Sequence, residues 1–275
     1  MKYCKIKYIL AIALLLASAC AWAGTLRTVT LKTDLVPAPD VDVNIILPEG
    51  YDSVARFPTV YLLHGYSGNY ASWSKIRPDL LDLADRYGMV MVMPDARTSW
   101  YWDSPVDSTM KMESFIINEL VPYIDSICPT IPVPEKRAIT GLSMGGHGAM
   151  WLAFRHPDVF KNVGSMSGGV DMMLLPEGWD VPRWLGPRTG NEQLWRDHMV
   201  VSLVPTIQPG QFNIIFDCGV DDFIVEGNNE LHKLLLEAEI PHDYISRPGV
   251  HDVPYWKNAV AYHLLFFNDA FNRAE

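Results

Sequence analysis

The chain opens with two segments, 25–33 and 41–47, in which hydrophobic and polar residues alternate. This two-residue alternation predicts β-strands. From Thr59 onward, short apolar runs alternate with longer segments whose apolar residues recur every three or four positions, which predicts amphipathic helices between buried strands. The strands predicted from this region are 59–63, 89–93, 137–140, 162–166, 212–217 and 243–246, and the helices are 74–87, 110–127, 144–156, 226–240 and 253–271.

Strands separated by helices of this length predict an α/β fold, with a mostly parallel sheet and helices on both of its faces. The regular order stops between Asp171 and Gln211, a segment rich in Pro, Gly and Trp with one predicted helix at 192–198. We expect an irregular insertion there, and insertions of this length often form lids or binding loops. Since no linker or repeat divides the rest, residues 24–275 are predicted to form a single domain.

The first 23 residues differ from the rest of the chain. Three lysines precede an apolar run at 8–19, and Ala-Trp-Ala at 21–23 has the small-x-small form of a cleavage site. The apolar run is too short to span a bilayer, so residues 1–23 are predicted to be a secretory signal peptide. The protein is then expected to be exported, either periplasmic or secreted. Cys20 leaves a second interpretation open, in which the chain is a lipoprotein anchored through that cysteine.

Composition and charge restrict the class of partner. Hydrophobic residues make up 49% of the chain and charged residues 20%, which is typical of a globular domain with a substantial core. Removing the three signal-peptide lysines from the 22 basic residues leaves 19 against 32 acidic ones, a net charge of −13. This acidity argues against nucleic acid and anionic membranes as partners.

Only Cys128 and Cys218 follow the predicted signal peptide, and both lie among apolar residues. Two cysteines in a chain of this length are not a disulfide framework, so we expect buried free thiols. No cysteine and histidine have the close spacing of a zinc site. Neither a metal nor another cofactor is therefore expected.

A Gly-x-Ser-x-Gly motif, formed by Gly141, Ser143 and Gly145, occurs once in the chain. It lies between a predicted strand and a predicted helix, the setting of a sharp turn that exposes the serine and brings neighbouring backbones close together. The helix N-terminus that follows offers free N–H groups to a developing negative charge. This setting favours a nucleophilic Ser143 over a glycine-rich packing turn.

A serine nucleophile needs a base to take its proton and an acid to orient the base. With this type of turn, the acid and then the histidine follow the serine in the sequence. Only His251 is predicted to lie in a loop just past the carboxyl end of a strand, where the crevice of an open parallel sheet is found. His251 is therefore the expected base.

The acid is expected after the predicted strand 212–217, where Asp221 and Asp222 are adjacent. The residues alone do not separate these two, and Asp217 is a weaker third choice because it still belongs to the strand. An oxyanion hole needs two backbone N–H groups. We expect them from Met144, which follows the nucleophile, and from Tyr66, which follows a strand ending in His-Gly.

Four segments, in order, resemble the esterase D family, and the resemblance covers about residues 40–270. The segments are Leu-His-Gly-Tyr-Ser-Gly-Asn at 63–69, Gly-Leu-Ser-Met-Gly-Gly-His-Gly at 141–148, Cys-Gly-Val-Asp-Asp-Phe at 218–223 and the His251 loop. This family includes tributyrin-type esterases, S-formylglutathione hydrolases, feruloyl and acetyl-xylan esterases of carbohydrate esterase family 1, and antigen 85-type mycolyltransferases.

The resemblance implies an α/β-hydrolase fold and hydrolysis of small acyl esters through an acyl-enzyme. It also implies that Asp222 rather than Asp221 is the acid, because the second acidic residue of this segment has that role in the family. Transfer of the acyl group to a sugar hydroxyl is an alternative, since the same triad serves both reactions. A carbohydrate-binding homologue without catalytic activity is a further alternative from another class.

Aromatic residues are the only indication of the substrate. Trp100, Tyr101 and Trp102 follow a predicted strand end near the expected crevice, and other tryptophans lie in loops or the insertion: Trp73, Trp179, Trp184 and Trp195. Two interpretations remain open, a stacking surface for a sugar or aromatic acyl group, or packing of the core and loops. Together with export, the aromatics favour a carbohydrate-linked feruloyl or acetyl ester over glutathione thioesters, whose chemistry belongs to the cytosol.

Overall fold

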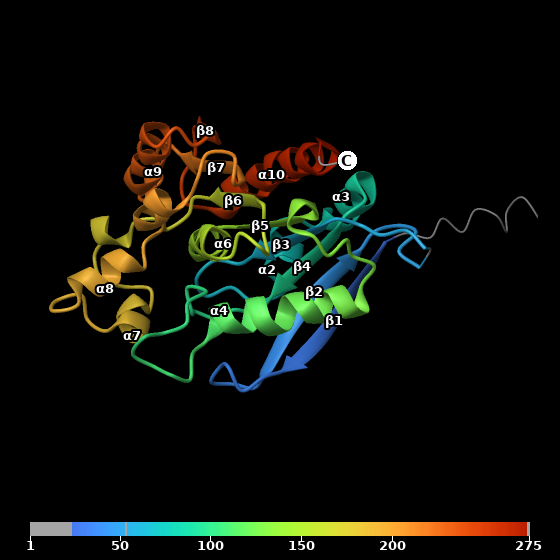
Figure 1. The fold of residues 1–275 in the computed structure, drawn as a ribbon, viewed down its shortest axis with the longest axis horizontal. Helices are drawn as coiled ribbons and strands as arrows, with labels where there is room; N and C mark the ends of the chain where they lie inside the picture. Colours follow the sequence, from blue (N-terminus) through green and yellow to red (C-terminus); the bar gives the residue numbers. More distant parts are fainter. Residues whose placement is uncertain (1–23, 53, 274–275) are drawn as a thin grey trace, which may run out of the picture.

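Eight strands form one sheet within the residues that the computed structural model describes, 24–52 and 54–273 (Figure 1). Their order across the sheet is β1-β2-β4-β3-β5-β6-β7-β8. The strands are β1 (Thr25–Lys32), β2 (Asp40–Leu47), β3 (Thr59–Leu63), β4 (Val90–Pro94), β5 (Arg137–Gly141), β6 (Asn162–Met166), β7 (Asn213–Gly219) and β8 (Asp243–Arg247). β2 runs antiparallel to both β1 and β4, whereas the remaining neighbours are parallel. The predicted signal peptide and Cys20 lie outside the described residues.

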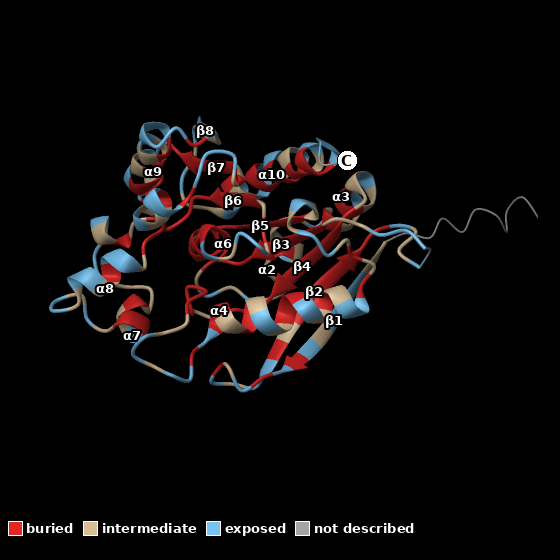
Figure 2. Cartoon of the chain, viewed as in Figure 1, coloured by how far each residue is buried: buried red, intermediate tan, exposed pale blue. Residues whose placement is uncertain are grey.

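The sheet separates two apolar clusters, because successive side chains of a strand point to opposite faces. In β3, Tyr61 and Leu63 pack into one cluster, and Val60 and Leu62 into the other. One face is covered by α2 (Ser72–Ile76), α3 (Leu80–Tyr87) and α10 (Val253–Arg273), and the other by α6 (Met144–Arg155), α9 (Val225–Glu237) and the segment from α4 to α5. Figure 2 shows the inner strands as largely buried between these layers, whereas the edge strands β1 and β8 are mostly exposed or half-buried. The predicted α/β class, with helices on both faces, is confirmed.

The predicted helix at 74–87 is wrong, because two helices replace it. α2 ends at Ile76 and α3 begins at Leu80. Pro78 lies between them; it has no backbone N–H and disfavours helical geometry at the preceding residue. Arg77 accordingly has φ −129° and ψ 81°.

The predicted helix at 110–127 is present, but its middle turn is wider than an α-helix. It consists of α4 (Met112–Ser114), the π-helical turn η1 (Phe115–Leu120) and α5 (Val121–Ile127). Pro122 lies at the start of α5, and in a regular α-helix its ring would collide with the carbonyl four residues earlier. The wider turn ahead of Pro122 relieves this collision.

The insertion at 171–211 is more ordered than the sequence indicated. It contains η3 (Met172–Leu174), α7 (Val181–Leu185), α8 (Glu192–Asp197) and η4 (Val200–Thr206), of which only α8 was predicted. Trp184 and Trp195 are 1% exposed and join the core cluster of the same sheet face as α6. The insertion therefore adds a packed layer beside the sheet.

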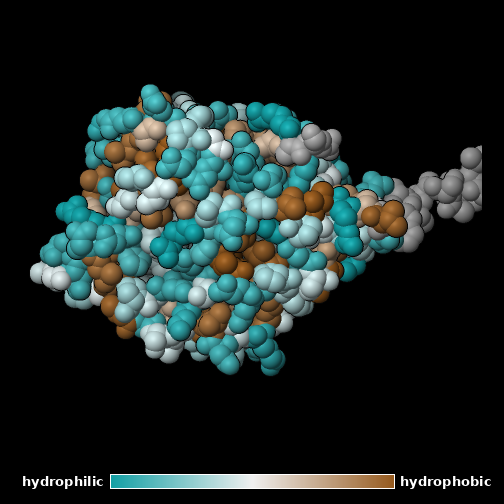
Figure 3. Space-filling view, viewed as in Figure 1, coloured by the Kyte–Doolittle hydropathy of each residue, from teal (hydrophilic) through white to brown (hydrophobic). Residues whose placement is uncertain are grey.

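Hydrophilic residues cover most of the face in Figure 3, and hydrophobic ones form only small patches. Cys128 and Cys218 are both buried free thiols, as expected. In the described part of the chain, no helix combines the length and apolar character needed to cross a membrane.

Candidate active site

Ser143 occupies the turn between β5 and α6, with φ 55° and ψ −118°. Two flanking glycines make this turn possible. A Cβ on Gly141 would lie 2.5 Å from the carbonyl oxygen of Gly145, and one on Gly145 would lie 2.5 Å from that of Leu63. Three backbone segments therefore approach one another more closely than any larger side chain allows. This packing holds Ser143 in a conformation that residues other than glycine rarely adopt.

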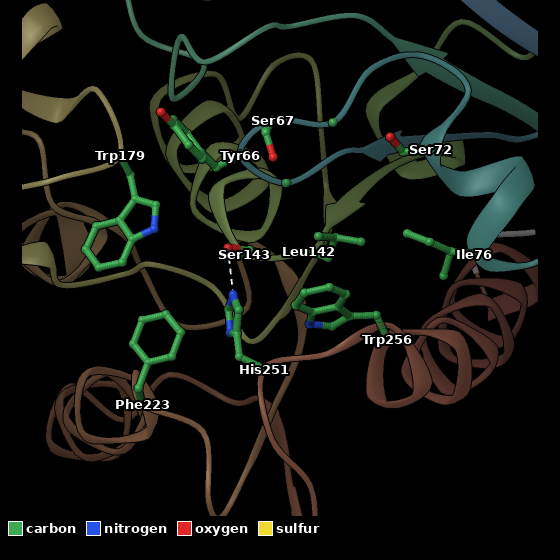
Figure 4. Close-up of a pocket in the computed structure, with 12 residues that line it drawn as sticks. Tyr66, Ser67, Ser72, Ile76, Leu142, Ser143, Trp179, Phe223, His251 and Trp256 are labelled. Atoms are coloured by element: carbon green, nitrogen blue, oxygen red, sulfur yellow. Dashed lines mark hydrogen bonds between the residues drawn. The ribbon is translucent and has the colours of Figure 1, made fainter.

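His251 joins Ser143 and Asp222 in a continuous hydrogen-bonded chain. Its Nε2 lies 2.9 Å from Ser143 Oγ, as Figure 4 shows by a dashed line, and its Nδ1 lies 3.0 and 2.9 Å from the two carboxylate oxygens of Asp222. The Asp222 carboxylate is fully buried and also accepts a hydrogen bond from the backbone N–H of Ile224. Burial beside His251 gives this carboxylate a strong preference for a cationic or donating partner.

The other two acid candidates lie apart from His251. Asp221 is exposed, and its backbone N–H donates to the carbonyl of Gly249. Asp217 lies in β7, 2.9 Å from Nε2 of the buried His263. The structure thus brings Asp222, of the three, into contact with His251.

The expected oxyanion donors lie at the same edge of the sheet. Met144 is the first residue of α6, and N–H groups in the first turn of a helix have no acceptor within it. Tyr66 follows β3 and lines the same cavity as Ser143.

His64 orients the peptide that carries the Tyr66 N–H. The backbone N–H of Ala96 donates to Nε2 of His64 (2.9 Å), so the ring proton is on Nδ1, which donates to the Gly65 carbonyl (2.8 Å). In a trans peptide the carbonyl and the following N–H point in opposite directions. By holding the Gly65 carbonyl, buried His64 therefore fixes the direction of the Tyr66 N–H.

Two cavities meet at Ser143. The large cavity has a volume of about 430 Å³ and is lined by His251. Its other walls include Ser67 from the loop after β3, Ser72 and Ile76 from α2, and Trp256 from α10. The small cavity, about 20 Å³, is lined by Trp100, Gly169, Met172, Leu175 and Ile224. Tyr66, Ser143, Trp179 and Phe223 line both. In Figure 4, Trp179 and Phe223 lie on one side of the Ser143–His251 pair, and Ile76 and Trp256 on the other.

The interpretation of Trp100, Tyr101 and Trp102 as a substrate-stacking surface needs correction. Tyr101 and Trp102 are 0% exposed, so neither offers a ring face to a substrate. Tyr101 donates its hydroxyl hydrogen bond to the His64 carbonyl, 2.9 Å away, and Trp102 stacks on Trp100 inside the core. Only Trp100 reaches a cavity, the small one. The packing interpretation therefore holds for Tyr101 and Trp102.

A buried histidine, His147, lies one turn after the nucleophile, between the rings of Trp100, Trp102 and Trp151. Its Nδ1 donates to the carbonyl of Gly169 at 3.0 Å. Burial lowers the pKa of His147 to about 3, against the opposing effect of that hydrogen bond. His147 is thus neutral at physiological pH and packs as an aromatic residue.

Three aromatic wall residues were missed as site residues. Phe223 directly follows Asp222, and Trp256 lies just over one helical turn after His251, so nearness to the triad was the available signal. Trp179 was noted only among the aromatics of the insertion. The other tryptophans noted there, Trp73, Trp184 and Trp195, are buried.

Among the described residues, no group of three or more His, Cys, Asp or Glu side chains is arranged to hold a metal ion. At the site itself, the structure presents a serine, its hydrogen-bonded histidine and the backbone N–H groups around them.

Comparisons with known proteins agree on the family. Residues 37–267 match the family described as "Putative esterase". An acetyl esterase of Caldicellulosiruptor saccharolyticus is 27% identical over 218 residues, which are 74% of this chain and 80% of that protein. The diacylglycerol acyltransferase/mycolyltransferase Ag85A of Mycobacterium leprae is 30% identical over 227 residues, 74% of this chain and 66% of its own. A solved ferulic acid esterase superposes with a TM-score of 0.76 at 27% identity, covering 91% of this chain and 99% of that structure.

The mostly parallel sheet covered on both faces, with a serine at the turn after β5, defines an α/β-hydrolase. The chain belongs to the matched esterase family, and it is an enzyme, a serine hydrolase of carboxylic esters. The resemblance seen in the four sequence motifs is confirmed.

Proposed function

We propose that Ser143 is the nucleophile, His251 the general base and Asp222 the acid that orients it. The supporting observation is the unbroken hydrogen-bonded chain from Ser143 Oγ through both ring nitrogens of His251 to Asp222. His251 takes the serine proton as Oγ attacks the ester carbonyl, and returns it to the departing alcohol oxygen. Water then cleaves the acyl-enzyme by the same route in reverse.

The backbone N–H groups of Tyr66 and Met144 stabilise the negative charge on the tetrahedral oxygen in this proposal. Each such donor typically contributes about 10²–10³ in turnover. Support comes from the position of Met144 at the N-terminus of α6 and from His64, which fixes the Tyr66 peptide.

We further propose an exported esterase of carbohydrate-linked feruloyl or acetyl groups. The basic and apolar start of the sequence supports export, and the aromatic and hydroxyl side chains of the large cavity support a sugar-bearing alcohol. The named relatives act on acetyl and feruloyl esters in their own right.

Hydrolysis of p-nitrophenyl acetate by the wild type and by Ser143→Ala tests the proposal. We expect kcat to fall about a thousandfold or more in the variant, because without the nucleophile only the oxyanion donors and substrate binding remain. Equal rates would rule out Ser143 as the nucleophile. Circular dichroism of both proteins establishes that the variant is folded.

Acyl transfer is the second candidate, favoured by the 30% identity to the mycobacterial acyltransferase. Adding a sugar acceptor to the same assay separates the two reactions. A hydrolase releases one acetate per p-nitrophenol whatever the acceptor concentration, whereas a transferase forms acetylated sugar at the expense of free acetate.

A further inference from the structure

The two cavities at Ser143 differ in whether His251 lines them, and this difference determines how a bound ester is oriented. His251 lines the large cavity but not the small one, whereas Ser143 lines both. In the proposed mechanism His251 protonates the leaving alcohol, so the alcohol oxygen must lie beside its Nε2. The alcohol therefore occupies the large cavity, which leaves the small cavity for the acyl group.

We infer that the small cavity is the acyl site and that its walls restrict the enzyme to acetyl-sized groups, which makes its substrates acetyl esters rather than feruloyl esters. This inference rests on the proposed function, because it takes His251 as the proton donor to the alcohol. It resolves the choice between acetyl and feruloyl that the sequence leaves open.

The size of the small cavity sets the limit. A cavity needs about 10–15 Å³ on this measure to hold one water molecule, and the small cavity has about 20 Å³. That space accepts the methyl group of an acetyl ester, which is close to a water molecule in size. A feruloyl group, with a phenyl ring on a three-carbon chain, exceeds it several times over.

The walls of the small cavity are fixed by packing and hydrogen bonds. Trp100 and Met172 are each 3% exposed, and a Cβ placed on Gly169 would lie 2.8 Å from the Trp100 ring. The indole N–H of Trp100 donates to the carbonyl of Trp179 at 2.8 Å. Trp179 in turn stacks on Phe223, with ring centroids 5.9 Å apart and planes 7° apart. A longer acyl chain would have to displace this assembly.

The large cavity suits a bulky, hydroxylated alcohol. It presents the hydroxyl-bearing side chains of Ser67 and Ser72 together with the rings of Trp179 and Trp256 (Figure 4). Sugars combine faces that pack on aromatic rings with hydroxyls that hydrogen-bond. Together the two cavities suit an O-acetylated carbohydrate, with its acetyl group in the small cavity and its sugar in the large one, toward solvent.

The p-nitrophenyl esters of acetic, butyric, hexanoic and ferulic acid test this inference, because they share one alcohol. With the full chain we expect kcat/KM to fall at least about tenfold from acetate to butyrate, and further for hexanoate and ferulate, since each excluded methylene costs about 10–200-fold. Leu175→Ala enlarges the small cavity at a half-buried position and should raise the butyrate-to-acetate ratio about tenfold. Ile76→Ala makes a similar truncation in the large cavity and should leave that ratio within about twofold.

Each outcome bears on one proposal. Equal kcat/KM across the series, or a preference for ferulate, with activity still dependent on Ser143, would overturn the acetyl inference and leave the proposed function standing. So would an equal change of the ratio in both variants. No hydrolysis of any ester, or hydrolysis unchanged in Ser143→Ala, would instead overturn the proposed function. If Leu175→Ala does not fold, the wild-type series decides alone.

Discussion

Burial, more than the position in the sequence, distinguishes the two adjacent aspartates. The Asp222 carboxylate is fully buried against the His251 ring, whereas Asp221 is exposed and contributes its backbone N–H to the His251 loop. A buried carboxylate is stable in the folded protein only when donors satisfy it, and His251 and Ile224 do so here. Neighbouring residues can therefore have opposite environments at a loop, a difference that composition and spacing do not encode.

Asp222→Asn and Asp221→Asn form a matched pair for testing this distinction. Asp222→Asn should lower kcat about 10³–10⁴-fold, because an amide can hold His251 in the wrong tautomer. Asp221→Asn should leave kcat within about threefold of the wild-type value, since the Asp221 side chain is exposed. Steady-state kinetics on p-nitrophenyl acetate give both values. A larger loss in the Asp221 variant would reverse the assignment.

At the scale of elements, the turn between β5 and α6 depends on the approach of three backbone segments. Gly145 is a tight contact in this turn, because a Cβ there meets the carbonyl oxygens of Leu63 and His64 at 2.5 and 2.6 Å. These atoms belong to backbone that cannot rotate away. β3, the loop after it that begins with His64 and α6 are thus positioned by one another, and a change at their contact disturbs all three.

Gly145→Ala should lower the free energy of unfolding by about 1–3 kcal/mol, since it overpacks a rigid contact. This loss opposes the gain of about 0.5–1 kcal/mol that alanine normally brings to a helix. Gly178→Ala is the matched control, because nothing lies within 4 Å of its Cβ position, and its effect should be about 0.5 kcal/mol or less. Urea unfolding measures both, and similar losses would contradict the steric argument.

The sequence predicted several short strands with their bounds, but it missed a break inside a long helical segment and helices too short to show periodicity. The predicted bounds of β3 and β6 agree with the structure. β3 is an apolar run that follows Pro58 and ends just before His64-Gly65. The split between α2 and α3 was overlooked although Pro78 marks it. The five-residue α7 was also missed, because so short a helix shows no periodicity and is held by tertiary contacts such as that from the Trp184 indole to the Thr98 carbonyl.

For the site, Ser143 and His251 could be placed because strand ends are recognisable in the sequence and meet at one edge of a parallel sheet. The residues that form the cavity walls could not be placed in this way. Trp100, Trp179 and Phe223 come from three segments, and their contact depends on side-chain directions within irregular loops. Local patterns carry no information on such contacts.

Stability of the whole molecule should depend on pH through His147. Its folded pKa of about 3 lies below the ordinary value of 6.5, so between these values the unfolded chain binds a proton that the folded one does not. Stability therefore falls as the pH falls through this window, by about 1.4 kcal/mol per pH unit from this one site. The contribution of His147 to stability is fully present above about pH 6.5.

His147→Gln should flatten this dependence, because glutamine does not titrate and its amide can still donate toward Gly169. The measurement is the free energy of urea unfolding at pH 7, 6, 5 and 4. The free energy of unfolding should change less steeply with pH than in the wild type, by the equivalent of about one bound proton. This holds even if the variant is less stable overall. Parallel curves would show that His147 does not contribute.

The burial of both thiols affects how the folded protein responds to redox conditions. Burial raises the pKa of Cys128 to about 11 and that of Cys218 well above its usual range. Disulfide exchange and oxidation both start from the thiolate, which hardly forms at either residue near neutral pH. Neither thiol takes part in the described contacts of the triad. At these two thiols the folded protein is thus insensitive to redox conditions, so a reducing and an oxidising surrounding should leave the described structure the same.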